Sequence, residues 1–183
     1  MSSTTELPLA MWHPERITAI VSQNGNMYEE GLGKKWETRK EYWLHPTHEL
    51  RQQFTSAYAL DTIIGQYTYG TPEGSVGPDG YSLDYYYVNL PGRAEMQNDL
   101  ILDYRSNVAL YAEFQKYLRD YQPPLMAVWG EYDPSFIPAG ARVFKRDQPN
   151  AEIRFVASGH FALESHHTEN AMMMKDFLNR ALR

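Results

Sequence analysis

The sequence predicts an α/β fold in which a small parallel sheet is interrupted by a long helical insertion. Three short apolar runs without strict alternation, at 17–21, 125–129 and 153–157, are typical of parallel strands that are buried on both faces. A helical pattern separates the last two runs, and another follows the third run. Strand, helix, strand and helix at this spacing indicate a β-α-β unit with a right-handed crossover.

The first strand, Ile17–Val21, is followed by a long and mostly helical segment that covers residues 28–122. Within it we expect helices at Glu49–Ile64 and Glu95–Asp120. The stretch Tyr69–Gly80 between them is rich in glycine and proline, which predicts a loop. The insertion therefore separates the first strand from the second by about ninety residues.

The second strand, 125–129, follows two prolines, and we expect a short helix after it at 138–145. The third strand is 153–157, and a C-terminal helix is expected from about Thr168. The apolar residues of that helix recur at the spacing of one amphipathic face: Ala171, Met174, Phe177, Leu178 and Ala181.

The bulk composition excludes several classes of function. Seventeen basic and twenty-three acidic residues give a net charge of −6 without a basic cluster, so neither a nucleic-acid nor a membrane partner is expected. The chain has no cysteine, which excludes disulfides, thiolate catalysis and zinc–thiolate sites. It shows neither a long apolar run nor a secretory signal, and the expected location is cytoplasmic.

Chemistry in a parallel sheet collects at the carboxyl ends of the strands. Here those ends carry Ser22–Asn26, Gly130–Pro134 and Ser158–His160. Asp133 can accept the imidazole N–H of His160, which leaves the other ring nitrogen free to act as a base. For either residue alone, an ordinary turn or loop position remains the alternative.

Three segments of the chain resemble α/β-hydrolase proteins of the haloalkane dehalogenase and epoxide hydrolase type. The closing segment carries G-x-x-D-P at Gly130–Pro134, P-x-A-E at Pro149–Glu152 and G-H-F-A-L-E at Gly159–Glu164. "HPERITAIVSQNGNMYEEGLG" resembles the strand after the nucleophile's helix, and "LPGRAEMQNDLILDYRSNV" resembles the helical cap. The acid also precedes the histidine, which is the order in this fold.

The resemblance implies the C-terminal part of an α/β-hydrolase fold, with about three parallel strands and an inserted, mostly helical cap. Residues 1–27 would hold the end of the nucleophile's helix and one core strand, 28–122 the cap, and 123–183 the core with acid and histidine. Asp133 is then the triad acid and His160 the base. The implied substrate is a small apolar ester, epoxide or halide, and no cofactor or metal is implied.

The sequence predicts no nucleophile within this chain. The required strand-to-helix turn should precede His13, and Met1–Glu6 does not resemble it. Glu73–Gly77 lacks the first glycine of G-x-S-x-G and sits in a loop. We therefore expect a truncated or partial hydrolase that needs an N-terminal half, and self-association through the exposed edge of 17–21. The alternative is a catalytically inactive binding or regulatory fragment.

Four further residues are candidates for a substrate pocket: Asn24, Phe136, Phe161 and Tyr104. Asn24 ends the first strand, where a turn role is the alternative. Tyr104 lies in the expected cap, where a phenol can donate a hydrogen bond to a substrate oxygen. The His45–His48 pair has no acid partner, so no metal site is expected, and His166–His167 is interpreted as solvated surface before the last helix.

Overall fold

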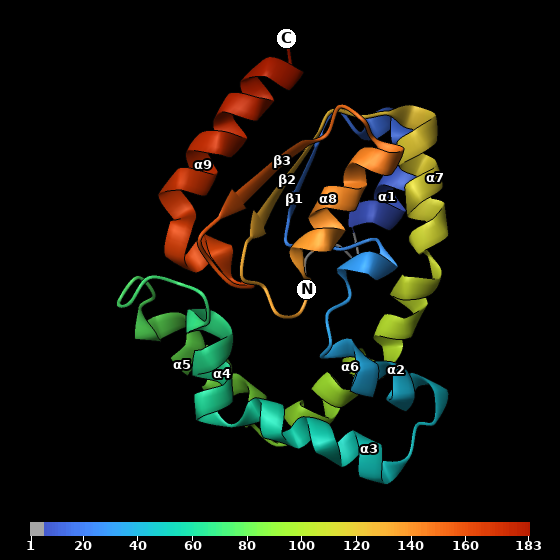
Figure 1. Ribbon diagram of the computed structural model, residues 1–183. Coiled ribbons are helices and arrows are strands. Elements are labelled where there is room, and N and C mark those ends of the chain that lie inside the picture. The colour runs from blue at the N-terminus through green and yellow to red at the C-terminus, as the bar shows by residue number, and fades with distance from the viewer. Residues whose placement is uncertain (1–5) are drawn as a thin grey trace.

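The computed structural model describes residues 6–183, and its centre is a parallel sheet of three strands in the order β1-β2-β3 (Figure 1). The strands are β1 (Ile20–Gln23), β2 (Leu125–Gly130) and β3 (Glu152–Val156). Every residue of β2 is buried, as expected of a central strand that is covered on both faces. The prediction of three parallel strands is confirmed.

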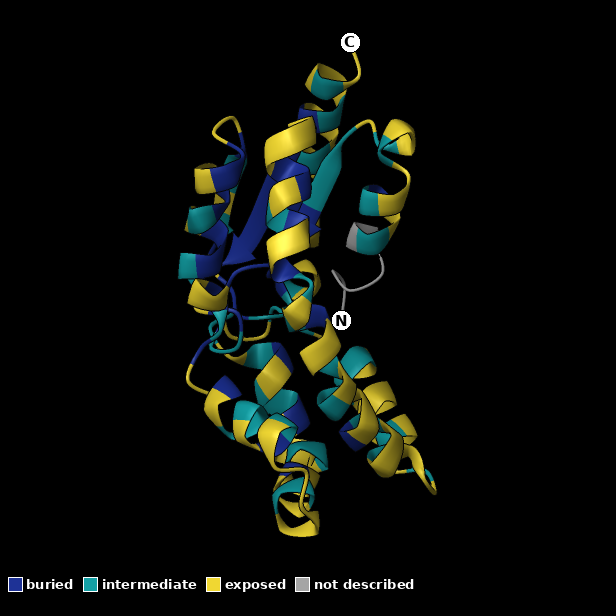
Figure 2. Cartoon of the chain, turned by 90° about the vertical axis from the view of Figure 1, so that its right-hand side faces the viewer, coloured by how far each residue is buried: buried dark blue, intermediate teal, exposed yellow. Residues whose placement is uncertain are grey.

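Helices cover both faces of the sheet. On one face Leu125, Ala127 and Trp129 of β2 pack with apolar residues of α1 (Glu6–Trp12), α7 (Tyr111–Tyr121) and α8 (Pro138–Asp147). The alternate residues Met126 and Val128 point to the other face, toward α9 (Ala162–Ala181). Figure 2 shows the matching pattern on the helices, whose inner faces are buried and whose outer faces are exposed.

Between β1 and β2 the chain runs through six α-helices and two 3-10 turns. Besides α7, they are η2 (Glu29–Gly31), α2 (Trp36–Leu44), α3 (His48–Gln53), η3 (Phe54–Tyr58), α4 (Leu60–Thr68), α5 (Pro78–Val88) and α6 (Arg93–Ala109). A further 3-10 turn, η1 (Pro14–Arg16), joins α1 to β1. Figure 1 shows α2–α6 beyond the arrowheads of the strands, which is the end where chemistry is expected.

The first strand begins three residues later than the pattern predicts, at Ile20 instead of Ile17. Ile17 donates its N–H to the carbonyl of Pro14 and so closes the turn η1. Ile20 is the first residue opposite β2, where it faces Leu125. The ladder therefore begins where the neighbouring strand begins, which the apolar run alone did not reveal.

The helices also differ from the predicted ones in their bounds. Helix α9 consists of two helices joined at a kink at His166 (φ −126°, ψ 31°). The second of them follows His166 and corresponds to the helix predicted from about Thr168, whereas the first, from Ala162, was not predicted. The predicted helix over 95–120 is divided into α6 and α7 at Leu110. The predicted helix over 49–64 is interrupted by η3, and α5 takes the last residues of the predicted loop. The segment 1–5, for which no nucleophile turn is predicted, lies outside the described residues.

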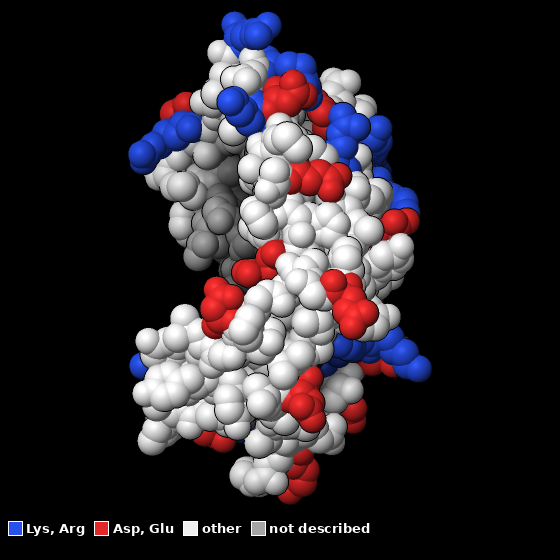
Figure 3. Space-filling model, turned by 90° about the vertical axis from the view of Figure 1, so that its left-hand side faces the viewer, with Lys and Arg blue, Asp and Glu red and all other residues white. Residues whose placement is uncertain are grey.

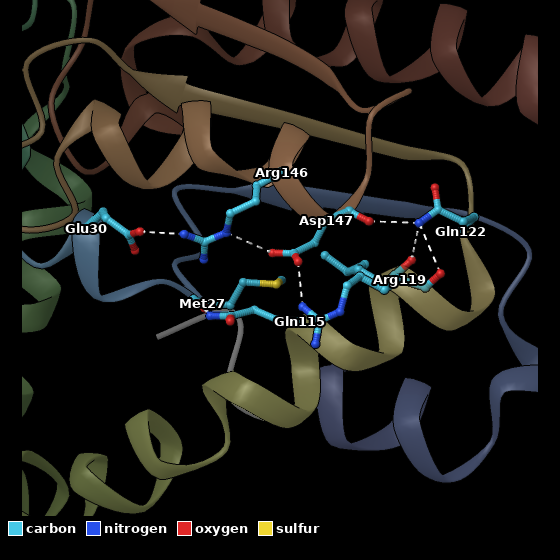
Figure 4. A network of polar contacts seen from close by, with 8 residues as sticks. Met27, Glu30, Gln115, Arg119, Gln122, Arg146 and Asp147 are labelled. Carbon is cyan, nitrogen blue, oxygen red and sulfur yellow. Dashed lines mark hydrogen bonds and ion pairs between the residues drawn. The ribbon is translucent and has the colours of Figure 1, made fainter.

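A polar network ties the last inserted helix to the core (Figure 4). The side chain of Asp147 is 4% exposed and accepts from Arg119 of α7 at 2.5 Å, with Arg146 at 3.5 Å on its other oxygen. Gln122, just after α7, donates to the backbone carbonyl of Asp147 at 2.8 Å. Arg146 also reaches Glu30 of η2 at 2.6 Å, so one buried carboxylate links the beginning and the end of the insertion to α8.

Both outer edges of the sheet lack a paired strand among residues 6–183, because β1 and β3 each pair with β2 alone. Strand β1 has only four residues and is mostly half-buried. Its outward N–H and C=O groups are a template for pairing with another strand.

No helix in the described part of the chain is long and apolar enough to cross a membrane. Figure 3 shows one face of the molecule, on which basic and acidic side chains lie among uncharged ones.

We expect Asp147→Ala to lower the free energy of unfolding by about 1–3 kcal/mol, because it leaves two arginines without their shared acceptor. The measurement is urea denaturation followed by circular dichroism. The matched control is Asp120→Ala, which removes an exposed ion pair with Lys116 within α7. That change should cost less than about 0.5 kcal/mol, and an equal loss in both variants would contradict the role of the network.

Candidate active site

The candidate site is built on the turn that follows β2. Strand β2 ends at Gly130, and the Asp133 N–H donates back to the Gly130 carbonyl at 3.2 Å, which closes a tight turn. The turn is held against the end of β3, because Tyr132 donates its N–H to the carbonyl of Ser158 at 2.9 Å. Asp133 is 2% exposed, so its carboxylate needs donors from within the protein.

Fixed donors reach both oxygens of Asp133. One oxygen accepts from the backbone N–H groups of Ser135 at 2.8 Å and Phe136 at 3.1 Å. The other oxygen accepts from the side-chain amide of Asn24 at 2.5 Å and is 2.7 Å from Nδ1 of His160. Since the carboxylate acts as an acceptor throughout this arrangement, Nδ1 of His160 is the donor, and the tautomer of the ring follows from it.

The other ring nitrogen of His160, Nε2, is free to accept a proton from a reacting group. The side chain of His160 is 26% exposed, whereas that of Asp133 is fully buried. Among residues 6–183, no serine, threonine or glutamate side chain forms a hydrogen bond with the His160 ring. A buried acid that orients a half-exposed imidazole is the arrangement of a general base with its supporting acid.

Asn24 supports this pair from the end of β1. Its backbone has φ 45°, a left-handed conformation that asparagine adopts more readily than most residues. Its side-chain oxygen accepts from the Gly130 N–H at 3.0 Å, which directs the amide nitrogen toward Asp133. The preceding Gln23 donates to the same oxygen at 2.5 Å and to the carbonyl of His160 at 3.4 Å. The ends of all three strands thus meet in one hydrogen-bonded cluster.

Two glycines allow the loops of the site to approach one another. A Cβ atom on Gly130 would lie 1.9 Å from the backbone oxygen of Gly159. A Cβ on Gly159 would lie 2.1 Å from the backbone oxygen of Tyr69, which follows α4. Glycine is therefore needed at both positions, and the loop that carries His160 is fixed between the sheet and the helical insertion.

The structure places the other predicted pocket residues at different distances from the imidazole. Phe136 and Phe161 flank His160, with ring centroids at 5.6 Å and 5.2 Å. The ring centroid of Tyr104 is 6.3 Å from that of Phe136, and the Tyr104 ring does not pack against the imidazole of His160. Asn24 is buried beneath Asp133, with both ends of its amide engaged. A role in binding substrate remains a prediction for all four residues.

Sequence reasoning missed three residues that shape the site. Gln23 was not singled out, although it precedes Asn24 at the strand end. Trp36 stacks on Phe136 at 5.2 Å and donates its indole N–H to the carbonyl of Ser135. Tyr67 stacks on Phe161 at 4.3 Å. The position of Gln23 at a carboxyl end was a usable signal, whereas nothing in the local sequence distinguishes Trp36 or Tyr67 from packing aromatics.

The remaining histidines and the loop serine lie apart from this pair. His166 lies at the kink of α9, where it is half-buried and hydrogen-bonded to Ser165 at 2.8 Å, and His167 is exposed. His48 contacts Gln52 within α3. Ser75 donates to the carbonyl of Pro72 within the loop before α5. The described residues contain no group of three histidine or acidic side chains placed to hold a metal ion.

Comparison with known proteins identifies the family. Residues 5–167 match the family model described as alpha/beta hydrolase fold, which is most of the chain. The chain belongs to the alpha/beta hydrolase fold family. It is also 41% identical over 165 residues to the uncharacterized hydrolase YNR064C of Saccharomyces cerevisiae. The match covers 86% of this chain and 56% of the yeast protein, so the chain spans little more than half the length of that relative.

Two solved structures share the architecture of this chain at low sequence identity. A 2-hydroxy-6-oxo-6-phenylhexa-2,4-dienoate hydrolase from Rhodococcus sp. strain RHA1 has a TM-score of 0.66 at 12% identity, over 98% of this chain and 61% of that one. Cfl2 from Burkholderia cenocepacia has a TM-score of 0.68 at 15% identity, over 93% and 60%. These likenesses support the fold alone. The finer likeness to haloalkane dehalogenases and epoxide hydrolases remains a prediction.

We expect Gly130→Ala to lower the free energy of unfolding by about 1–3 kcal/mol, because its Cβ would overlap the backbone of the His160 loop. The matched control is Gly65→Ala within α4, where a Cβ has no neighbour within 4 Å. That change should raise stability by up to about 1 kcal/mol. Thermal denaturation of the two variants tests this prediction. If both substitutions raised the stability, or both lowered it, the close packing of Gly130 against the His160 loop would be contradicted.

Proposed function

We propose that this chain carries the acid and the base of a hydrolase that cleaves a small apolar substrate through a nucleophile–histidine–aspartate triad. Asp133 is the acid and His160 the base. The observation that supports this most directly is the 2.7 Å hydrogen bond between a buried carboxylate and a half-exposed imidazole at the carboxyl end of a parallel sheet. Family membership supports the same chemistry.

In the proposed mechanism, Nε2 of His160 removes a proton from the nucleophile or from the attacking water. The imidazolium that forms is stabilised by Asp133, whose carboxylate is already positioned at Nδ1 and needs no rearrangement. Asn24 and the N–H groups of Ser135 and Phe136 hold that carboxylate in place. Water, side chains and substrate are sufficient for these steps.

The aromatic surroundings of His160 favour an apolar substrate. Phe136 and Phe161 both pack close to the imidazole, and Tyr67 stacks on Phe161. Such rings bind hydrocarbon groups and exclude water from a reacting bond. An ester, an epoxide or a carbon–halogen bond would each suit this surface, and the nucleophile that attacks it would decide among them.

The nucleophile would lie on a strand that pairs with the free edge of β1. None of the described serine or threonine side chains approaches the His160 ring within hydrogen-bond distance. Strand β1 pairs on one side only among residues 6–183, and a parallel neighbour there would end at the same edge as Asn24 and Asp133. We propose that this neighbour comes from a segment outside 6–183 or from a second chain.

The test is turnover of 4-nitrophenyl esters, styrene oxide and short bromoalkanes by two proteins. One is the chain of 183 residues, and the other also includes any upstream in-frame coding sequence. We expect no turnover by the first, and turnover by the second that falls about 1,000-fold or more in His160→Ala, because the general base is lost. Asp133→Asn should show a loss of similar order, because it removes the negative charge and allows an amide N–H to face Nδ1, which stabilises the wrong tautomer of His160.

His167→Ala is the matched control, since His167 is an exposed histidine on α9. Its turnover should stay within about twofold of the parent. Turnover by the 183-residue chain that needs His160 would overturn the proposed origin of the nucleophile. Activity that survives His160→Ala would overturn the proposed base.

The second candidate function is a non-catalytic binding or regulatory module that associates through β1. The observation that favours it is the free edge of this strand. We expect the chain to self-associate in sedimentation experiments, and Val21→Pro to shift it toward monomer, because proline removes a backbone donor. Val88→Pro at the end of α5 is a control away from the sheet. A monomer whose state does not depend on concentration would contradict this candidate.

A further inference from the structure

Three buried polar atoms where α2 meets α6 have no hydrogen-bond partner. They are Nη1 of Arg39, Oη of Tyr104 and Nδ2 of Asn107. All three can donate a hydrogen bond, and the two helices that carry them pack against each other. Since buried donors are nearly always satisfied in folded proteins, a cluster of them indicates a missing acceptor.

Arg39 is the charged member of this cluster. Its guanidinium lies over the ring of Trp36, at 4.6 Å from the ring centroid. Among the residues whose side chains the structure describes, no carboxylate forms an ion pair with it. Burial lowers the pKa of Arg39, and the nearest groups that oppose this effect are the phenols of Tyr104 and Tyr58. A half-buried cation in this setting favours an anion.

The α6 side of the cluster adds two neutral donors. Tyr104 and Asn107 are three residues apart, which places them on the same face of the helix. Asn107 is 7% exposed. Burial raises the pKa of Tyr104, so its phenol keeps its proton. The phenol lies near the hydroxyl of Tyr111 and the side chain of Asn107, but neither contact is a well-formed hydrogen bond. Neutral donors beside one guanidinium suit an oxyanion.

We propose that Arg39, with Tyr104 and Asn107, binds a carboxylate group of the substrate. This inference rests on the proposed hydrolase function and specifies its substrate as one that carries a carboxylate at a distance from the bond that is cleaved. A single guanidinium balances a single negative charge, and its planar fork matches a carboxylate.

A chain of packed and largely buried aromatic rings connects this cluster to the candidate base. Phe136 lies 5.6 Å from His160, Trp36 stacks on Phe136 at 5.2 Å, and Arg39 covers Trp36. Tyr104 also packs against Trp36, at 4.8 Å. A substrate whose apolar part lies along these rings would place its reacting bond at His160 and its carboxylate at Arg39. The substrate would therefore be an apolar acid with a cleavable group at its far end.

Binding of benzoate to the whole chain tests the inference without requiring turnover. Benzamide is the neutral probe of nearly the same shape. We expect benzoate to raise the melting temperature and to change tryptophan fluorescence, because Trp36 lies directly beneath Arg39, and benzamide to bind at least about tenfold more weakly. Arg39→Met should weaken benzoate binding about 10–100-fold, and Arg39→Lys less, because lysine keeps the charge without the fork.

Arg142→Met is the matched control, because Arg142 also covers an aromatic ring, that of Phe155, on α8. It should leave benzoate binding unchanged. His160→Ala should also still bind benzoate, so a failure of the proposed catalytic pair would be distinguished from a failure of this inference. Equal binding of benzoate and benzamide, or benzoate binding that survives Arg39→Met, would overturn the proposal and assign the unpaired donors to buried water.

Discussion

The buried carboxylate of Asp133 is the group on which the rest of the site depends. An ionised group that is withdrawn from water needs a donor for each oxygen, and here the donors come from different parts of the chain. Asn24 donates from the end of β1, and Ser135 and Phe136 donate from the turn after β2. His160 donates from the loop after β3. Satisfying one carboxylate thus fixes the relative position of three loops that are far apart in sequence.

The helical insertion is held to this core in two ways. At the strand ends, the backbone of Tyr69 approaches Gly159 so closely that no side chain fits between them. At the other end, Asp147 joins α8 to Arg119 of α7, and Arg146 joins it to η2. The insertion therefore contacts the loop of His160 directly, and a ligand bound among its helices can be aligned with the imidazole.

Much of the fold could be predicted from local pattern. The three parallel strands, the order of Asp133 before His160 and the helical nature of the insertion each depend on short apolar runs or turn chemistry. The errors lie where a contact from another part of the chain decides. The first strand starts at Ile20 because Leu125 faces it there.

The sequence by itself determined the strands and the acid–histidine pair, because these follow from residue types at short spacing, and its motifs resembled those of the family. Only the tertiary structure decided what surrounds the pair. It placed Asn24 beneath Asp133, and it placed Trp36 between Phe136 and Arg39. No local sequence pattern reveals these contacts, because each joins residues from different helices, strands or loops. Such long-range contacts stabilise the protein only after the chain has folded.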